Sequence, residues 1–347
     1  MKRIPSLDGF RAISILLVLF HHSGFSAGFS TAIYNISRKA DVGVTIFLVI
    51  SGFLITNLLL NEEADFGKID VKSFYIRRIY RIVPVYLLYI LFIFIWRNIE
   101  PIMVTNSNLL HALTFTTNFD SNKGWFLAHF WSLSVEEQFY LFWPATLILC
   151  RKNIKTALAI LVVYSCIARV IAYTLPALET ITLSPFFEFS GPIFVGAFGG
   201  VLFFESPQIL HRKVFSSSFA QLAALTVFIA FPYFTAHGRL AIISVPFGHL
   251  IISLTILFLI FAYILPSDKI VFKVLNNKAI VHIGVLSYSI YIWQQFFFIG
   301  EFRGIWRTFP YNILIIYVVS LISYYLWEKP FLKIKNSFHH KKLQAAV

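Results

Sequence analysis

The clearest candidates for chemistry in this sequence are an arginine and a histidine inside its first apolar stretch. Arg11 and His22 lie eleven residues apart, and a helix that turns by about 100° per residue brings them to within about 20° of one face. Ionisable side chains inside a membrane span are costly and therefore indicate function. We predict that Arg11 and His22 are catalytic and that Asp8, on the same face, supports Arg11 as its ion-pair partner. The alternative is an interfacial Asp8–Arg11 pair with a hydrogen-bonded packing histidine.

Two adjacent carboxylates, Glu136 and Glu137, follow Trp131 and Ser134 where another apolar stretch begins. Neighbouring helix positions point about 100° apart, so at most one carboxylate faces His22 directly. We predict that both are catalytic residues, one of which orients or charges the imidazole, and that Trp131 and Ser134 support them. In the alternative, acids in a first helical turn complement the helix dipole and Ser132 or Ser134 caps the helix. Both interpretations stay open.

Three arginines, Arg77, Arg78 and Arg81, lie within five positions at the start of a third apolar stretch. Guanidinium groups bind phosphates bidentately, so the cluster is a candidate site for a phosphate-bearing ligand. Ordinary anchoring to lipid headgroups competes with this interpretation. Ser51, beside Gly52 in the preceding apolar stretch, is a further supporting candidate, although helix packing explains that pair about equally well.

The elements that must position these residues are predicted to be membrane helices. Of the 347 residues, 58% are hydrophobic and 13% are charged, whereas a soluble domain carries about 25% charged residues. Disorder is excluded by 39 Phe, 16 Tyr and 7 Trp. Runs of about 20 apolar residues predict an all-α polytopic protein with about ten transmembrane helices. These runs are 9–27, 42–61, 80–96, 132–150, 154–175, 186–205, 217–235, 243–264, 280–299 and 311–328.

The basic residues predict the orientation of this bundle. The net charge is +13, but the lysines and arginines lie between the apolar runs, which argues against nucleic acid as a partner. With ten spans, 20 of the 29 fall on the side of the N-terminus and 7 on the opposite side. The positive-inside rule then places both termini in the cytoplasm. We predict a transmembrane domain over 1–335 and a short basic cytoplasmic tail over 336–347, close to anionic membrane lipids.

Several segments together resemble the acyltransferase-3 family of integral membrane acyltransferases, along essentially the whole chain. The matching segments are Leu-Asp-Gly-Phe-Arg-Ala at 7–12 with His22, Ser-Gly-Phe-Leu-Ile at 51–55, the Arg78–Pro84 run, Trp131–Gln138, Ser287–Trp293 and Glu328-Lys329-Pro330. One departure is Gln294, where many relatives carry histidine.

The resemblance implies an O-acyltransferase that moves an acyl group, usually acetyl from acetyl-CoA, to a hydroxyl of a surface glycan or lipid-linked sugar. It implies roles for Arg11 and His22 as the family's arginine–histidine pair, and for Arg78 and Arg81 as its cytoplasmic arginine motif. With Arg77, these arginines are expected to bind acyl-CoA. Some relatives carry an additional esterase-like domain; its absence here leads us to expect transfer within the membrane core or hand-over to another protein.

Other functions are also considered. A transporter or flippase would use the buried charges as a relay, and a non-catalytic bundle would use them to tie helices together. No metal is expected, because the histidines and two cysteines lack metal-ligand spacing. We expect a multi-pass protein of the bacterial plasma (inner) membrane. The acceptor (O-antigen, exopolysaccharide, capsule or a small molecule), the acyl length and the role of His22 as base or acyl carrier remain open.

Overall fold

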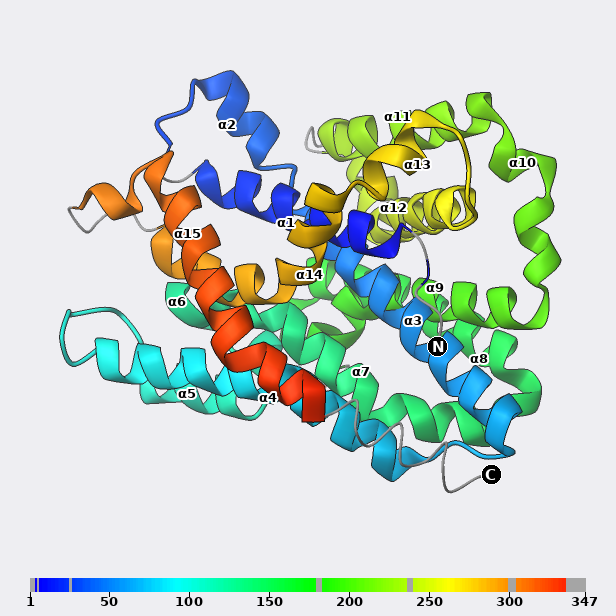
Figure 1. Ribbon diagram of the computed structural model, residues 1–347, viewed down its shortest axis with the longest axis horizontal. Coiled ribbons are helices and arrows are strands. Elements are labelled where there is room, and N and C mark those ends of the chain that lie inside the picture. Colours follow the sequence, from blue (N-terminus) through cyan, green and yellow to red (C-terminus); the bar gives the residue numbers. More distant parts are fainter. Residues whose placement is uncertain are drawn as a thin grey trace.

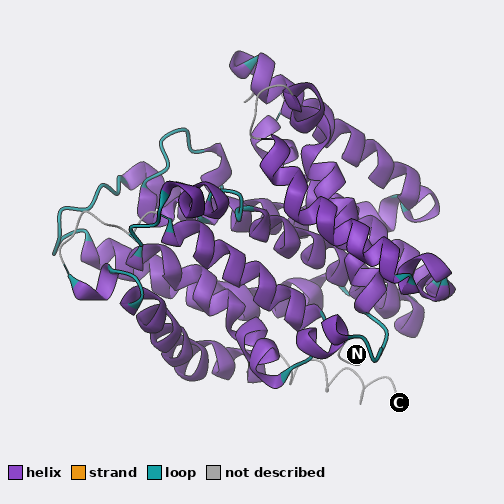
Figure 2. Ribbon diagram, turned by 90° about the horizontal axis from the view of Figure 1, so that it is seen from above, coloured by secondary structure: helices purple, strands orange, loops and turns teal. Residues whose placement is uncertain are grey.

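The computed structural model describes residues 4, 6–24, 27–178, 183–235, 240–298 and 304–334. These ranges are mostly helical, with short loops between the helices, and contain no strand (Figure 2), which confirms the all-α class. The tail predicted over 336–347 lies outside them.

A long helix coincides with each predicted apolar stretch. These helices are α1 (Leu7–Ser23), α3 (Val42–Phe66), α4 (Val71–Trp96), α7 (Phe130–Leu149), α8 (Ile154–Thr174), α9 (Ser184–Glu205), α11 (Ser218–Thr235), α12 (Ala241–Tyr263), α14 (Lys278–Trp293) and α15 (Tyr311–Ile322), continued by the π-helical η8 (Ser323–Glu328). Shorter α-helices connect them: α2 (Thr31–Ser37), α5 (Asn106–Leu113), α6 (Trp125–Ala128), α10 (Lys213–Ser216) and α13 (Ile270–Leu275).

Six helical segments in the described residues are long and apolar enough to cross a membrane. They are Thr31–Phe66, Val71–Trp96, Arg151–Thr174, Pro185–Glu205, Ala241–Tyr263 and Tyr311–Ile334. Helices α1, α7, α11 and α14 fall short of the same length or hydropathy. The chain is therefore a multi-pass membrane protein, while ten crossings and the side of the termini stay predictions.

Local sequence signals explain where several helices begin and end. The Asp70 side chain caps α4 by accepting a hydrogen bond from the backbone N–H of Ser73 at 3.0 Å. Asn277 caps α14 in the same way through Ala279 N–H at 2.9 Å. Helix α3 ends at Phe66 and is followed by Gly67, whose φ of 71° lies in the left-handed region that favours glycine. Between these ends, the apolar sequences form helices because lipid offers no partners for backbone polar groups.

Glycines bring the central helices into close contact. A Cβ atom on Gly52 of α3 would collide with the Ile193 carbonyl of α9, and one on Gly196 of α9 would collide with the Val49 carbonyl. Gly284 of α14 likewise faces the Asp8 carbonyl of α1. Helices α1 and α14 accordingly lie side by side (Figure 1). These contacts, with α7, build the centre of the bundle, where the candidate residues lie.

Candidate active site in two adjoining cavities

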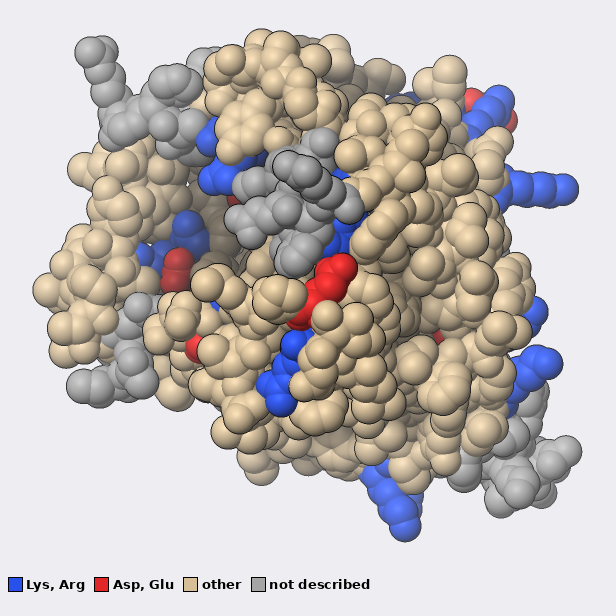
Figure 3. All heavy atoms as spheres, turned by 90° about the vertical axis from the view of Figure 1, so that its left-hand side faces the viewer, with Lys and Arg blue, Asp and Glu red and all other residues tan. Residues whose placement is uncertain are grey.

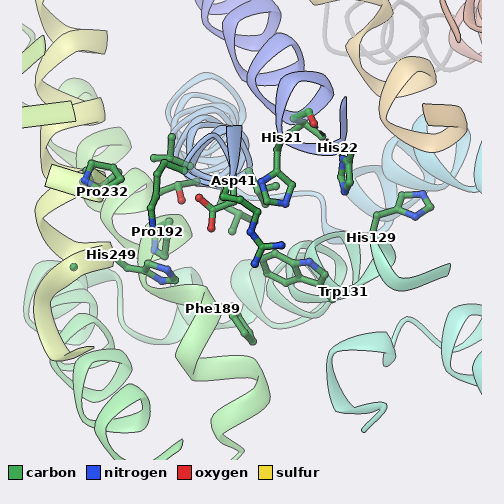
Figure 4. A pocket seen from close by; sticks show the side chains of 18 of the residues that line it. His21, His22, Asp41, His129, Trp131, Phe189, Pro192, Pro232 and His249 are labelled. Atoms are coloured by element: carbon green, nitrogen blue, oxygen red, sulfur yellow. Dashed lines mark hydrogen bonds between the residues drawn. The ribbon is translucent and has the colours of Figure 1, made fainter. Parts of the chain in front are cut away.

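The larger cavity has a volume of about 550 Å³ and contains His22. Helices α1, α3, α7, α8, α9 and α12 all contribute to its wall. Figure 4 shows labelled side chains around this cavity, among them His22 from α1, Trp131 from α7, Phe189 from α9 and His249 from α12. Its charged and imidazole side chains are His21, His22, Arg38, Lys39, Asp41, His129, Arg169 and His249, and its aromatic lining includes Trp125, Trp131 and Phe189. The view in Figure 3 shows a largely uncharged face on which some charged side chains lie in a hollow.

His22 is oriented by its own helix. Its Nδ1 lies 3.1 Å from the carbonyl oxygen of Val18. Because a carbonyl only accepts, Nδ1 carries the proton in this contact, and Nε2 is the nitrogen that can take up another. The ring packs edge-on against Trp125 and stacks on Phe298, with centroids 6.0 and 5.8 Å away. The imidazole therefore has a defined tautomer and a fixed plane.

Three more imidazoles line the larger cavity. His129 Nε2 lies 3.2 Å from the Ile292 carbonyl, and its buried Nδ1 has no hydrogen-bond partner among the described residues. His249 accepts from Arg169 at 2.9 Å, which ties α12 to α8. No group of three His, Cys, Asp or Glu within the described ranges could hold a metal ion.

The smaller cavity, of about 80 Å³, gathers the arginines predicted from distant parts of the chain. Arg11, Arg78 and Arg81 line it together with Ser51 and Glu136. Arg11 donates to Asp8 at 3.2 Å, so the predicted ion pair is confirmed.

The three clustered arginines differ in their contacts. Arg77 turns to Glu62 and forms a 2.8 Å ion pair, and it lines neither cavity. Arg78 lies over the rings of Tyr140 and Phe74, with its guanidinium carbon 5.1 and 5.8 Å from their centroids. Its buried Nε has no hydrogen-bond partner among the described residues. A buried guanidinium N–H aimed at no protein acceptor is suited to an anionic ligand.

The structure places the carboxylates beside arginines rather than in the cavity of His22. Glu136 accepts hydrogen bonds from the hydroxyls of Ser51 and Tyr140 and lines the smaller cavity. Glu137 interacts electrostatically with Arg78, and its buried Oε1 has no hydrogen-bond partner among the described residues. The printed contact of His22 Nδ1 is with the Val18 carbonyl, and neither carboxylate lines the larger cavity. The helix position explains this, because α7 turns these residues toward α3 and α4.

The two supporting residues on α7 differ in their surroundings. Trp131 lines the larger cavity and packs against Phe189, with ring centroids 4.6 Å apart. Ser134 is buried and accepts from the Thr117 N–H at 3.1 Å while donating to the Phe130 carbonyl. It therefore ties the 97–131 connection to α7 and is not its N-cap.

A shared wall joins the two cavities. Val44, Leu48 and Tyr291 line both of them. The Tyr291 hydroxyl lies 2.6 Å from the Ser132 hydroxyl and 2.6 Å from the His129 carbonyl, to which it donates. Arg11 and His22 thus face opposite sides of one wall, not a single open cavity.

Sequence reasoning missed Tyr140, Tyr291 and the Arg169–His249 pair as site residues. An arginine in the middle of an apolar stretch was a usable signal for Arg169, since such residues face the interior of a bundle. Tyrosines give no such signal, because they are common in membrane helices.

Comparison with known proteins gives the family. The acyltransferase domain of the acyltransferase-3 family matches residues 4–328. A "Putative O-acetyltransferase" of Staphylococcus aureus (strain COL) is 28% identical over 328 residues, covering 85% of this chain and 50% of the relative. The peptidoglycan O-acetyltransferase OatA of Listeria monocytogenes is 26% identical over 326 residues, covering 84% and 49%.

The chain spans about half the length of the curated relatives it matches. No solved structure matches it significantly. The family match nevertheless includes all the cavity residues described above, and the resemblance predicted from Arg11, His22 and the arginine motif is confirmed. This chain belongs to the acyltransferase-3 family.

Proposed function

We propose that the chain is a membrane-embedded O-acyltransferase that moves an acyl group, in the simplest case acetyl, from cytoplasmic acyl-CoA to a hydroxyl of a surface glycan. The observation that carries the proposal is the meeting of a guanidinium-lined cavity with a histidine-containing cavity across one shared wall. The O-acetyltransferase names of the relatives support the same activity.

The smaller cavity is suited to the donor. Acyl-CoA carries several phosphates, and Arg78 and Arg81 present guanidinium groups to anionic ligands. The cavity of about 80 Å³ holds only a few water-sized groups, so it admits the slender thioester arm while the nucleotide stays outside. Arg11 stands where it can stabilise negative charge on the thioester carbonyl.

The larger cavity is suited to the acceptor. It combines aromatic rings, including Trp131 and Phe189, with several polar side chains, a composition typical of pockets that orient polar ligands. A sugar hydroxyl beside His22 would have a proton acceptor within the same cavity.

In the proposed reaction His22 Nε2 removes the proton of the acceptor hydroxyl. The oxygen attacks the thioester carbonyl, the new C–O bond forms and the C–S bond breaks. The CoA thiolate leaves and takes up the proton, so that His22 returns to its starting state. General-base assistance of this kind contributes about 10²–10⁴-fold. Transfer through an acyl-histidine intermediate is the alternative route.

We also propose the setting of this reaction. The chain would lie in the bacterial plasma membrane with ten crossings, both termini in the cytoplasm and the catalytic domain over 1–335. The acceptor would be peptidoglycan, as the name of the Listeria relative suggests, or another surface polysaccharide.

The test is acyl transfer by the full chain reconstituted in lipid vesicles. Radiolabelled acetyl-CoA and peptidoglycan fragments or surface polysaccharide are supplied, and both thiol release and labelled glycan are measured. The expected result is equal amounts of the two products. Movement of glycan across the vesicle membrane without thiol release would support a flippase and contradict the proposal.

A further inference from the structure

The wall between the two cavities is formed by aliphatic and aromatic side chains, and this matters for which acyl donor the chain accepts. Its three side chains are Val44, Leu48 and Tyr291, which we call the neck. Val44 and Leu48 are four residues apart on α3 and so lie on one face of that helix. Tyr291 comes from α14. The neck is thus formed by two aliphatic side chains and one aromatic ring from separate helices.

We infer that the neck sets the length of the acyl group that the chain transfers, admitting an acetyl group and excluding longer acyl chains. The inference rests on the proposed function, because it requires the donor thioester to enter the arginine-lined cavity and its carbonyl carbon to stop at the neck, between Arg11 on one side and His22 on the other. At the neck the acyl group, which extends beyond the thioester carbon, meets apolar side chains before any polar group of the larger cavity.

The geometry of the neck is fixed rather than loose. The Tyr291 hydroxyl is held by Ser132 and the His129 carbonyl, each at 2.6 Å. Its ring packs edge-on against Phe47 and His129, with centroids 6.1 and 5.5 Å away. Leu48 is 3% exposed and Tyr291 is 5% exposed. Moving the ring aside would break two buried hydrogen bonds, so extra acyl carbons cannot simply displace it.

The expected difference in kcat/KM between acyl donors can be estimated from packed apolar pockets that distinguish ligands differing by one methylene group. One additional methylene changes kcat/KM by about 10–200-fold. A short neck can therefore separate acetyl from butyryl transfer strongly, and removing part of one side chain should relax that separation.

The experiment compares acetyl-, propionyl- and butyryl-CoA with the reconstituted full chain and its Leu48→Ala and Val44→Ala variants. The measured quantity is the ratio of butyryl to acetyl kcat/KM. We expect Leu48→Ala to raise this ratio at least tenfold. The matched control is Leu59→Ala, on the same helix, fully buried and lining neither cavity; it should leave the ratio unchanged.

Leu48→Val provides a milder truncation if the alanine variant does not insert into the membrane, and it should raise the ratio by a smaller factor. An unchanged ratio in the neck variants, with acetyl transfer still measurable, would overturn the inference and leave the proposed function standing. Failure of the unaltered chain to transfer acetyl from acetyl-CoA to glycan would overturn the proposed function and this inference with it.

Discussion

At the scale of single residues, the structure places His22 in one cavity and Arg11, Arg78 and Arg81 in the other. His22 Nδ1 lies against a backbone carbonyl of its own helix, and neither Glu136 nor Glu137 lines its cavity. The carboxylates are instead placed near guanidinium groups, where Glu136 accepts hydrogen bonds from two hydroxyls. A buried negative charge costs least where such donors and positive charges surround it.

Replacement of His22 by alanine should lower acetyl transfer by about 10²–10⁴-fold, because the proton acceptor is lost. The measurement is the initial rate of labelled glycan formation in vesicles, with size-exclusion profiles to show that the variant is folded. His282→Ala is the control, since His282 contacts Tyr317 and lines neither cavity. A His22→Ala protein with a rate within threefold of the unaltered chain would contradict a role as base or carrier.

Arg77 and Arg78 should respond differently to alanine although they are neighbours. Arg78 lines the smaller cavity, and loss of its charge-assisted hydrogen bonds to the donor, each about 1.5–3 kcal/mol, should raise KM for acetyl-CoA by about 10–100-fold. Arg77→Ala breaks the ion pair with Glu62 and should lower thermal stability with little change in KM. Equal effects on KM would show that the donor contacts both.

The sequence made part of this site predictable. The Arg11–Asp8 pair followed from helical spacing, because both residues lie on one helix. The positions of Glu136 and Arg77 relative to His22 did not, because they depend on how α7 and α4 are rotated against α1. Such rotations are set by side-chain packing across helices, which spacing within one helix does not encode.

At the scale of elements, close helix contacts hold the cavity walls in place. The α3–α9 pair packs backbone against backbone at Gly52 and Gly196. In a membrane, this kind of packing supplies much of the helix association, since lipid is as apolar as the side chains. Because α3 carries Val44, Leu48 and Ser51, its fixed position also fixes one side of both cavities.

Substitution of Gly52 by valine should therefore destabilise the protein. The added atoms collide with the Ile193 carbonyl, and overpacking typically costs about 1–3 kcal/mol. We expect a lower midpoint of thermal unfolding in detergent by several degrees. Gly248→Ala on α12 is the control, because its new Cβ would meet its nearest neighbour at 3.8 Å, an ordinary contact. Equal midpoints for the two variants would show that the α3–α9 contact adapts.

Hydropathy located the long helices well and the connections poorly. All ten predicted stretches coincide with helices, since uninterrupted apolar runs leave few other structures. The 97–131 connection, by contrast, contains α5 and α6 and brings Trp125 and His129 to the larger cavity. Its mixed composition gives no clear period, so its packing against α7 is set by particular contacts such as the hydrogen bond from Thr117 to Ser134.

At the scale of the whole molecule, the orientation predicted from charge can be tested directly. Cys150 and Cys166 are first replaced by serine. Two variants of this protein then carry one new cysteine each, Lys123→Cys and Lys213→Cys, both at exposed positions. The excess of basic residues on one side predicts that Lys123→Cys reacts with a membrane-impermeant maleimide in intact cells, or in spheroplasts if an outer membrane is present. Lys213→Cys should react only after lysis. The reverse pattern would invert the proposed topology.

The tightly packed neck also bears on the electrical insulation of the membrane. A donor cavity and an acceptor cavity joined by an open passage would conduct ions, and each elementary charge crossing 100 mV dissipates about 2.3 kcal/mol. Leu48 and Tyr291 are buried and stand between the two cavities. In the proposed reaction, this arrangement would let an acyl group be presented from one cavity to the other while the proton gradient is maintained.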